Sequence, residues 1–158
     1  MYTRVLVPVD GSDVAAAVIP FIVGIAGPLD FEVTLLRVIH PVPPLGVDGP
    51  AYFNEEDVAA RHAEAAAYLA GLAGTLEARG LRVRTLVRRG EPAREILAAA
   101  TEARADLIAM ATHGRTGATR VLLGSVAEDV LRHADVPVFL LRQTEKELAR
   151  RQRELEAR

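Results

Sequence analysis

One stretch decides the fold: Leu107-Ile108-Ala109-Met110-Ala111-Thr112-His113-Gly114, with Leu122-Leu123-Gly124-Ser125 after it. An apolar run that ends in a glycine-containing loop predicts a buried strand, and Ser125 begins a segment with helical spacing. The first N–H groups of a helix lack partners inside the helix and lie at the positive end of its dipole. A glycine loop in front of such a helix is typical of a phosphate-binding site. The sequence therefore predicts that glycines 114 and 124 let phosphate approach amides around Arg115 and from Ser125 to Ala127.

The segments on either side repeat the same alternation of strand and helix. Strands are predicted at residues 4–9, 31–39, 81–87, 107–112 and 136–141. Between them we expect a helix over 14–29 bent at Pro20, a helix over 54–79, a helix opened by Glu91-Pro92, and a helix over 125–133. Strands that are apolar throughout and alternate with helices indicate an α/β fold, with a parallel sheet covered by helices on both faces. Ligands of such sheets bind beyond the carboxyl ends of the strands, where Asp10-Gly11-Ser12 and the loop after Thr112 fall.

Length and composition exclude several classes of protein. The chain has 158 residues, half of them apolar, which suits one domain. A net charge of −2, with three tyrosines and four phenylalanines, argues against a nucleic-acid partner. The sequence has no cysteine, so disulfides and thiolate chemistry are excluded. The start of the chain lacks a signal-peptide pattern, and the longest apolar stretch is too short and too broken for a bilayer, so we expect a cytoplasmic protein without membrane contact.

Two separated motifs resemble the universal stress protein family. The first is Val5-Leu6-Val7-Pro8-Val9-Asp10-Gly11-Ser12, and the second combines Met110 to Gly117 with Leu122 to Ala127. The resemblance covers residues 3–142 and implies a Rossmann-like fold of the adenine nucleotide alpha hydrolase type, a five-stranded parallel sheet of order 3-2-1-4-5 with helices on both faces. It also implies a homodimer joined through the last strand, Val136 to Leu141. We take residues 1–142 as a single domain and 143–158 as a charged tail that is helical or frayed.

One branch of that family binds ATP, and its motif is glycine, two residues, glycine, nine residues, then glycine followed by serine or threonine. In this chain Gly114, Gly124 and Ser125 match the motif, whereas Ala111 stands at the first glycine. The resemblance thus implies bound ATP, with Mg²⁺ held through the phosphates. The methyl group of Ala111 is expected to crowd the ligand at a cost of about 1 kcal/mol.

The resemblance also implies roles for residues outside the loop. Asp10 accepts hydrogen bonds from adenine or ribose, the backbone of Val38 contacts the adenine edge, and the adenine slot is lined by hydrophobic residues. The full set of predicted nucleotide-binding residues is Pro8, Val9, Asp10, Val38, Met110, Ala111, Gly114, Arg115, Gly124, Ser125, Val126 and Ala127.

Alternatives remain for several of these residues. Ser125 with Glu128 fits a capping box, in which its hydroxyl caps the helix, and Asp10 fits a turn carboxylate that binds the amides of Gly11 and Ser12. Arg115 and Arg120 are placed to pair with phosphate. His113 is assigned a structural role, because no nucleophile arrangement or metal-ligand spacing includes it.

The function that these observations favour is a small ATP-binding stress-response protein, a nucleotide-dependent binding or regulatory module. We expect at most slow ATP hydrolysis, because no general base or Walker lysine is evident. One alternative is a nucleotide-independent structural dimer whose pocket is closed by Ala111. The other is a nucleotidyl or phosphoryl transferase on the same fold.

Overall fold

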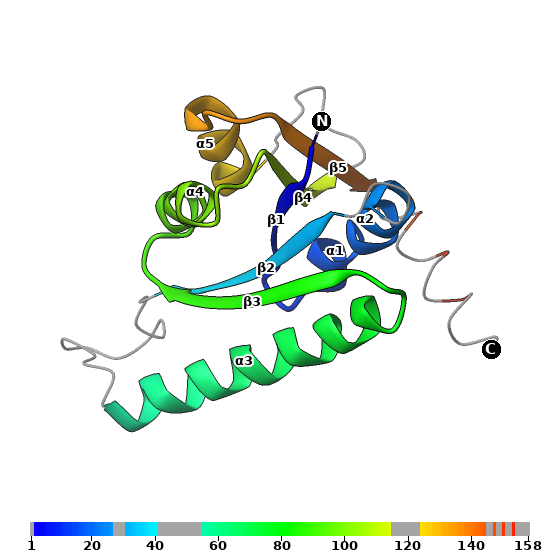
Figure 1. Ribbon diagram of the computed structural model, residues 1–158. Coiled ribbons are helices and arrows are strands. Elements are labelled where there is room, and N and C mark those ends of the chain that lie inside the picture. Colours follow the sequence, from blue (N-terminus) through cyan, green and yellow to red (C-terminus); the bar gives the residue numbers. More distant parts are fainter. Residues whose placement is uncertain are drawn as a thin grey trace.

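The structure, a computed structural model, describes residues 2–26, 31–40, 55–114 and 124–144, together with residues 147, 150 and 153. Strands and helices alternate along these ranges (Figure 1), as the sequence predicts. In chain order the elements are β1 (Arg4–Pro8), α1 (Asp13–Ala16), α2 (Ile19–Ala26), β2 (Glu32–Ile39), α3 (Glu55–Glu77), β3 (Arg82–Arg89), α4 (Pro92–Glu102), β4 (Leu107–Gly114), α5 (Ser125–His133) and β5 (Val138–Thr144).

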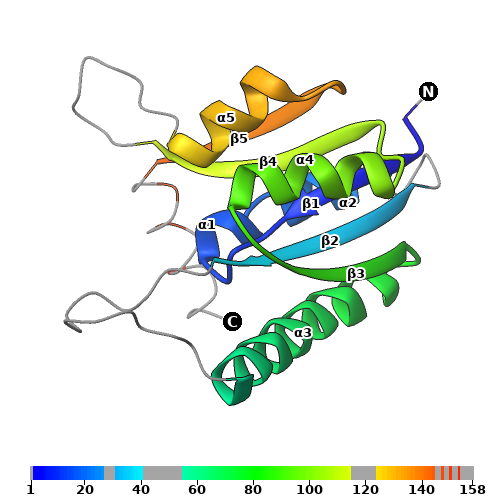
Figure 2. The same cartoon turned by 90° about the vertical axis from the view of Figure 1, so that its left-hand side faces the viewer.

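The strands form one parallel sheet of order β3-β2-β1-β4-β5, which confirms the order implied by the family resemblance. Strand β1 lies in the centre, next to β2 on one side and β4 on the other. The carboxyl ends of β1 and β4 therefore meet at one edge of the sheet (Figure 2). Strands β3 and β5 form the two lateral edges.

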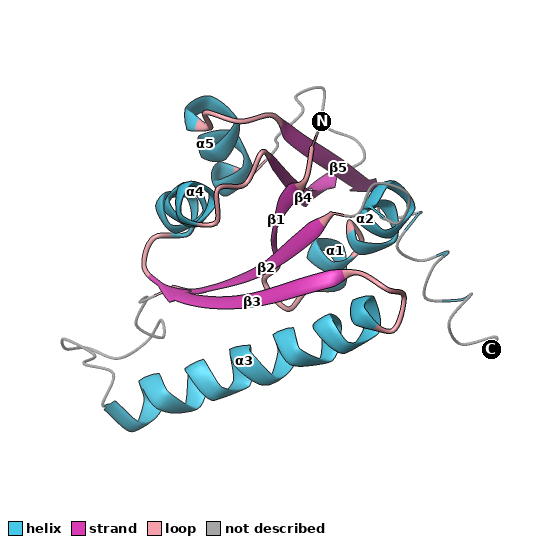
Figure 3. Ribbon diagram, viewed as in Figure 1, coloured by secondary structure: helices cyan, strands magenta, loops and turns pink. Residues whose placement is uncertain are grey.

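Helices cover both faces of the sheet, and each face has its own hydrophobic core (Figure 3). On one face, α1, α2 and α3 pack over a cluster that includes Val7, Ile22 and Leu69. On the other face, α4 and α5 pack over a cluster that includes Leu6 and Ile108. Successive residues of a strand point to opposite faces, so uninterrupted apolar runs such as Val5 to Val7 supply both cores.

The segment predicted as one helix bent at Pro20 consists of two separate helices, so the prediction of a single helix was wrong. Helix α1 ends at Ala16, and Pro20 is the second residue of α2. The N–H groups of Phe21 and Ile22 both donate to the carbonyl of Val18, at 3.1 Å each. Proline has no N–H to donate, and the first turn of a helix needs none at that position.

The last strand is longer than predicted. Strand β5 runs to Thr144, which pairs with Gly114 of β4, and Gln143 is buried. The strand thus continues two residues beyond residue 142, into the segment that the charges had suggested as a tail. The described tail residues 147, 150 and 153 are helical and exposed.

Candidate nucleotide site

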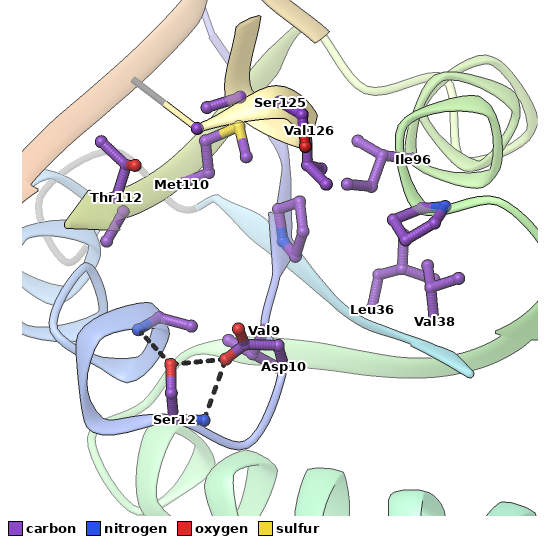
Figure 4. A pocket seen from close by; sticks show the side chains of 16 residues that line it. Val9, Asp10, Ser12, Leu36, Val38, Ile96, Met110, Thr112, Ser125 and Val126 are labelled. Atoms are coloured by element: carbon purple, nitrogen blue, oxygen red, sulfur yellow. Dashed lines mark hydrogen bonds between the residues drawn. The ribbon is translucent and has the colours of Figure 1, made fainter. Parts of the chain in front are cut away.

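A cavity of about 370 Å³ lies at the carboxyl edge of the sheet (Figure 4), within the usual range for small-molecule sites. Strands β1, β2 and β4 and the starts of α1, α4 and α5 form its walls. The lining residues are Pro8, Val9, Asp10, Ser12, Ala15, Leu36, Val38, Pro92, Ile96, Met110, Ala111, Thr112, Gly124, Ser125, Val126 and Ala127.

Ten of the twelve predicted site residues line this cavity. Gly114 is the last residue of β4, and its surroundings lie outside what the structure describes. Arg115 lies outside the described residues, as does Arg120. All the others line one hollow although they come from both ends of the chain.

Asp10 takes part in a short hydrogen-bond chain at the floor of the cavity (Figure 4). Its Oδ1 accepts the N–H of Ser12 at 2.9 Å and the hydroxyl of Ser12 at 2.5 Å. The Ser12 Oγ in turn accepts the N–H of Ala15 at 3.1 Å, which caps α1. The turn role predicted as an alternative is therefore present, but it occupies one carboxylate oxygen. The second oxygen, Oδ2, is directed at the cavity and remains available to a ligand among the described contacts.

Helix α5 begins without a side-chain cap, so the capping box that was the alternative for Ser125 is wrong. Its N-cap is Gly124, with φ +84° and ψ 146°, and no side chain caps it. The Glu128 N–H donates to the Gly124 carbonyl, and the Glu128 carboxylate pairs with Arg132 instead of reaching back. Ser125 is thus the first helical residue, and residues 124–127, whose first-turn amides lack partners inside the helix, line the cavity. A backbone with this φ and ψ favours glycine almost alone.

The other side of the cavity is apolar. Figure 4 shows Leu36, Val38, Ile96, Met110 and Val126 around one space, in which a flat base could be enclosed. Four lining residues have no counterpart in the sequence-based prediction, namely Ala15, Leu36, Pro92 and Ile96. Ser12 and Thr112 were expected at this edge of the sheet, although neither was assigned a nucleotide-binding role. Leu36 could have been predicted from the sequence, because it lies two residues before Val38 and so on the same face of the strand. The α4 residues were not, since only the folded sheet brings Pro92 and Ile96 over β2.

The backbone of Val38 is turned toward this space. In a parallel strand, the N–H and C=O of one residue point to the same neighbour and alternate from residue to residue. The Leu36 carbonyl accepts the N–H of Val9 at 2.8 Å, and the Ile39 carbonyl accepts the N–H of Gly90 at 3.1 Å. The N–H and C=O groups of Val38 therefore point toward the β1 side of the strand, as those of Leu36 do. Because the register of β1 with β2 ends at Pro8 and Leu36, the peptide groups of Val38 face the gap beyond that strand.

Ala111 does not close the cavity. Its side chain packs against the core under α1 and α2, on the opposite face of β4 from Met110. Ala111 also lines the cavity, so the crowding expected from its methyl group stays a prediction. Thr112 follows at the cavity wall, and a Cβ on Gly124 would lie 3.6 Å from its Oγ1.

The charges of the described lining are sparse. Asp10 is the one acidic or basic side chain among those residues. The parts of the chain that the structure describes contain no cluster of three or more metal-ligating His, Cys, Asp or Glu side chains. Within the same parts, no helix has the length and hydropathy needed to span a bilayer.

The chain is similar to known proteins over most of its length. The sequence signature of the universal stress protein family matches residues 1–142. Universal stress protein MJ0531 of Methanocaldococcus jannaschii is 35% identical over 149 residues, which are 93% of this chain and 86% of the relative. Among solved structures, universal stress protein UspA from Lactobacillus plantarum is 27% identical with a TM-score of 0.71, over 89% of this chain and 98% of that one. The universal stress protein from Archaeoglobus fulgidus, solved in complex with dAMP, is 24% identical with a TM-score of 0.62, over 88% of this chain and 97% of that one.

Proposed function

Since the chain belongs to the universal stress protein family, we propose that its cavity binds an adenine nucleotide and that the protein is a nucleotide-dependent regulatory module of the stress response. ATP is the proposed ligand, with Mg²⁺ held through the phosphate oxygens. Occupancy of the site would bias the surface or the dimer contacts of a cytoplasmic protein.

The uncapped start of α5 is the observation that carries this proposal. Gly124 brings the backbone to the wall of the cavity, and the amides of Ser125 to Ala127 follow in the first helical turn. Phosphate oxygens satisfy such amides and meet the positive end of the helix dipole. Charge-assisted hydrogen bonds to three such groups, each about 1.5–3 kcal/mol, supply much of the roughly 8 kcal/mol that micromolar affinity needs.

The remaining features suit a nucleoside beside those phosphates. The apolar side of the cavity fits an adenine ring, and the peptide groups of Val38 are placed to hydrogen-bond its edge. Asp10 Oδ2 is placed to accept a ribose hydroxyl. The complex of the Archaeoglobus fulgidus protein with dAMP supports the same class of ligand.

Hydrolysis is expected to be slow or absent. A general base must lie within hydrogen-bond reach of the attacking water. The one carboxylate of the described lining, Asp10, lies at the turn after β1 and has one oxygen engaged by Ser12, whereas the proposed phosphate site lies at the start of α5. The protein is therefore proposed to act by binding.

Calorimetric titration with ATP and Mg²⁺ tests the proposal, and we expect a dissociation constant in the micromolar range. Gly124→Val should weaken binding at least tenfold, because a side chain at this φ strains the start of α5 and blocks close approach of phosphate. Gly80→Val is the matched control, since Gly80 has φ +83°, lies at the end of α3 and has open space around it. It should show similar backbone strain with unchanged ATP affinity.

Three results would overturn the proposal. The first is no heat of binding to the wild-type protein at millimolar ATP, which would favour a nucleotide-independent dimer. The second is equal ATP affinity in wild type and Gly124→Val. The third is transfer of a phosphoryl or nucleotidyl group to a second substrate at a rate well above hydrolysis, which would indicate a transferase.

A further inference from the structure

Arg37 lies behind the turn that carries Asp10. Its neighbours on β2, Leu36 and Val38, line the cavity, so the side chain of Arg37 points to the opposite face of the sheet. There its Cζ lies 5.7 Å from the centre of the Tyr68 ring on α3. A Cβ built on Gly11 would lie 2.5 Å from Arg37 Nη1 and 3.3 Å from Cζ. The guanidinium therefore fills the space between α3 and the turn Asp10-Gly11-Ser12.

Packing alone does not explain an arginine at this position. The Nη1 atom is buried and has no hydrogen-bond partner among the described residues. A buried donor without a partner destabilises the folded protein, and contact with an aromatic ring offsets only part of that loss. Methionine has similar reach, fills the same space and contacts aromatic rings well without an unpaired donor. The arginine thus lowers the stability of the folded protein at this position, and a buried unpaired donor of this kind calls for a functional explanation.

The turn itself depends on support from this side. Gly11 has φ +85° and no side chain, so nothing of its own fills the space beneath it. Asp10 Oδ1 and Ser12 brace the turn along the chain, toward α1. The planar guanidinium is the group that lies directly against Gly11 on the side away from the cavity.

We propose that Arg37 is a positioning residue for the nucleotide site, which holds the turn from behind so that Asp10 Oδ2 meets a ribose hydroxyl. This inference rests on the proposed function. It predicts that Arg37 controls how strongly the protein distinguishes ribose from deoxyribose, although Arg37 itself does not line the cavity.

The test compares AMP with 2′-deoxy-AMP and 3′-deoxy-AMP in calorimetric titrations of wild type and Arg37→Met. Wild type should prefer AMP over at least one deoxy analogue by roughly tenfold, as expected for a hydrogen bond to a carboxylate. In Arg37→Met that preference should fall to about twofold or less, while the thermal unfolding midpoint stays equal or rises. A purely structural role for Arg37 would lower the unfolding midpoint and leave the preference unchanged.

Arg89→Gln is the control for charge, because Arg89 is an exposed arginine at the same end of the neighbouring strand. It should keep the wild-type preference. If Arg37→Met failed to fold, Arg37→Lys would be measured in its place, since lysine keeps the charge without the planar group and should also lose the preference.

The possible failures can be told apart. A wild-type preference for AMP that persists in the Arg37 variant would overturn this inference and leave the proposed function standing. A wild-type protein that binds AMP and both deoxy analogues equally would do the same, because Asp10 would then make no ribose contact. A wild-type protein that binds no adenine nucleotide would overturn the proposed function and this inference together.

Discussion

At the scale of single residues, two backbone positions show how conformation limits the choice of side chain. Gly124 has a φ that glycine alone adopts easily, and it lies where the proposed phosphate contact requires a bare backbone. Arg104 also has a positive φ, +49°, yet it carries a long side chain. It occupies the position after the C-cap of α4, where glycine is the usual residue.

Arg104→Gly should stabilise the protein by about 0.5–1 kcal/mol. The left-handed conformation destabilises an ordinary residue by about 1–2 kcal/mol, and glycine removes that strain. The greater conformational freedom of glycine in the unfolded chain offsets part of this stabilisation. The backbone bonds of this turn, such as that from the Ala105 N–H to the Ala100 carbonyl at 2.9 Å, stay possible in the variant. Urea denaturation measures the change. Arg94→Gly, inside the first turn of α4, is the control and should destabilise instead.

At the scale of elements, the type of each strand and helix and their succession along the chain could be predicted from the sequence. Long apolar runs and helix-ending glycines are local signals. The division at Pro20 was missed because the pattern does not tell whether proline bends one helix or begins another. The bounds of α5 were predicted correctly, but the alternative in which Ser125 caps the helix was wrong, because Gly124 is the N-cap and that depends on the backbone conformation there. The order of the strands within the sheet, in contrast, was predicted from the family resemblance and not from local patterns. Contacts between elements, such as Ile96 over β2 or Arg37 under Gly11, follow from the folded sheet and have no local signal.

The start of α4 provides a test at this scale. Glu91 caps the helix, and its carboxylate accepts the N–H of Ala93 at 3.1 Å and the N–H of Arg94 at 2.8 Å. Glu91→Ala should lower the free energy of unfolding by about 1 kcal/mol, as loss of an N-cap does. Glu91→Asp, which keeps a carboxylate at a capping position, should recover most of the stability in urea denaturation. Equal stability of Glu91→Ala and wild type would show that the cap contributes nothing.

At the scale of the whole molecule, Asp106 ties the start of the chain to the start of β4. Its carboxylate accepts the N–H groups of Thr3 and Arg4, at 2.9 and 3.0 Å, and the Thr3 hydroxyl at 3.0 Å. Burial acts to raise the pKa of Asp106, but these hydrogen bonds outweigh it and hold the pKa below its usual value of 3.8.

The stability of the protein should therefore depend on Asp106 in acid. A carboxylate whose pKa is depressed by folding stabilises the native state above its unfolded pKa, and that contribution is lost as the pH falls through the folded pKa. Asp106→Asn should lower stability at neutral pH and flatten the loss of stability below about pH 4. Urea midpoints measured across that range test this, with Asp129→Asn, an exposed carboxylate on α5, as the control. A variant with the same acid profile as wild type would contradict the assignment.

The proposed homodimer is also a property of the whole molecule. Strand β5 is at an edge of the sheet, and the Pro137 carbonyl accepts the N–H of Ile108. Backbone groups alternate in direction along a parallel strand, so the peptide groups of residues 139, 141 and 143 also point toward β4. The peptide groups of residues 140, 142 and 144 point to the open edge of the sheet.

Arg142→Pro should shift the mass measured by light scattering from dimer to monomer. Proline removes an outward N–H at that exposed position without breaking a bond to β4. Arg142→Ala keeps the N–H and should remain dimeric. A dimer that persists in Arg142→Pro would place the contact elsewhere on the surface.

The central position of β1 has a consequence for how the protein is made. Strand β1 is synthesised first, yet its partner β4 and the start of α5 come from the last third of the chain. During translation the walls of the cavity are thus incomplete until residues 124–127 have left the ribosome. A nucleotide bound there would by mass action add about 2.7 kcal/mol to the stability of the folded chain at a hundredfold excess over the dissociation constant. Fragments that end before α5 would gain nothing, so the ligand would widen the difference in lifetime between them and chains that contain the whole cavity.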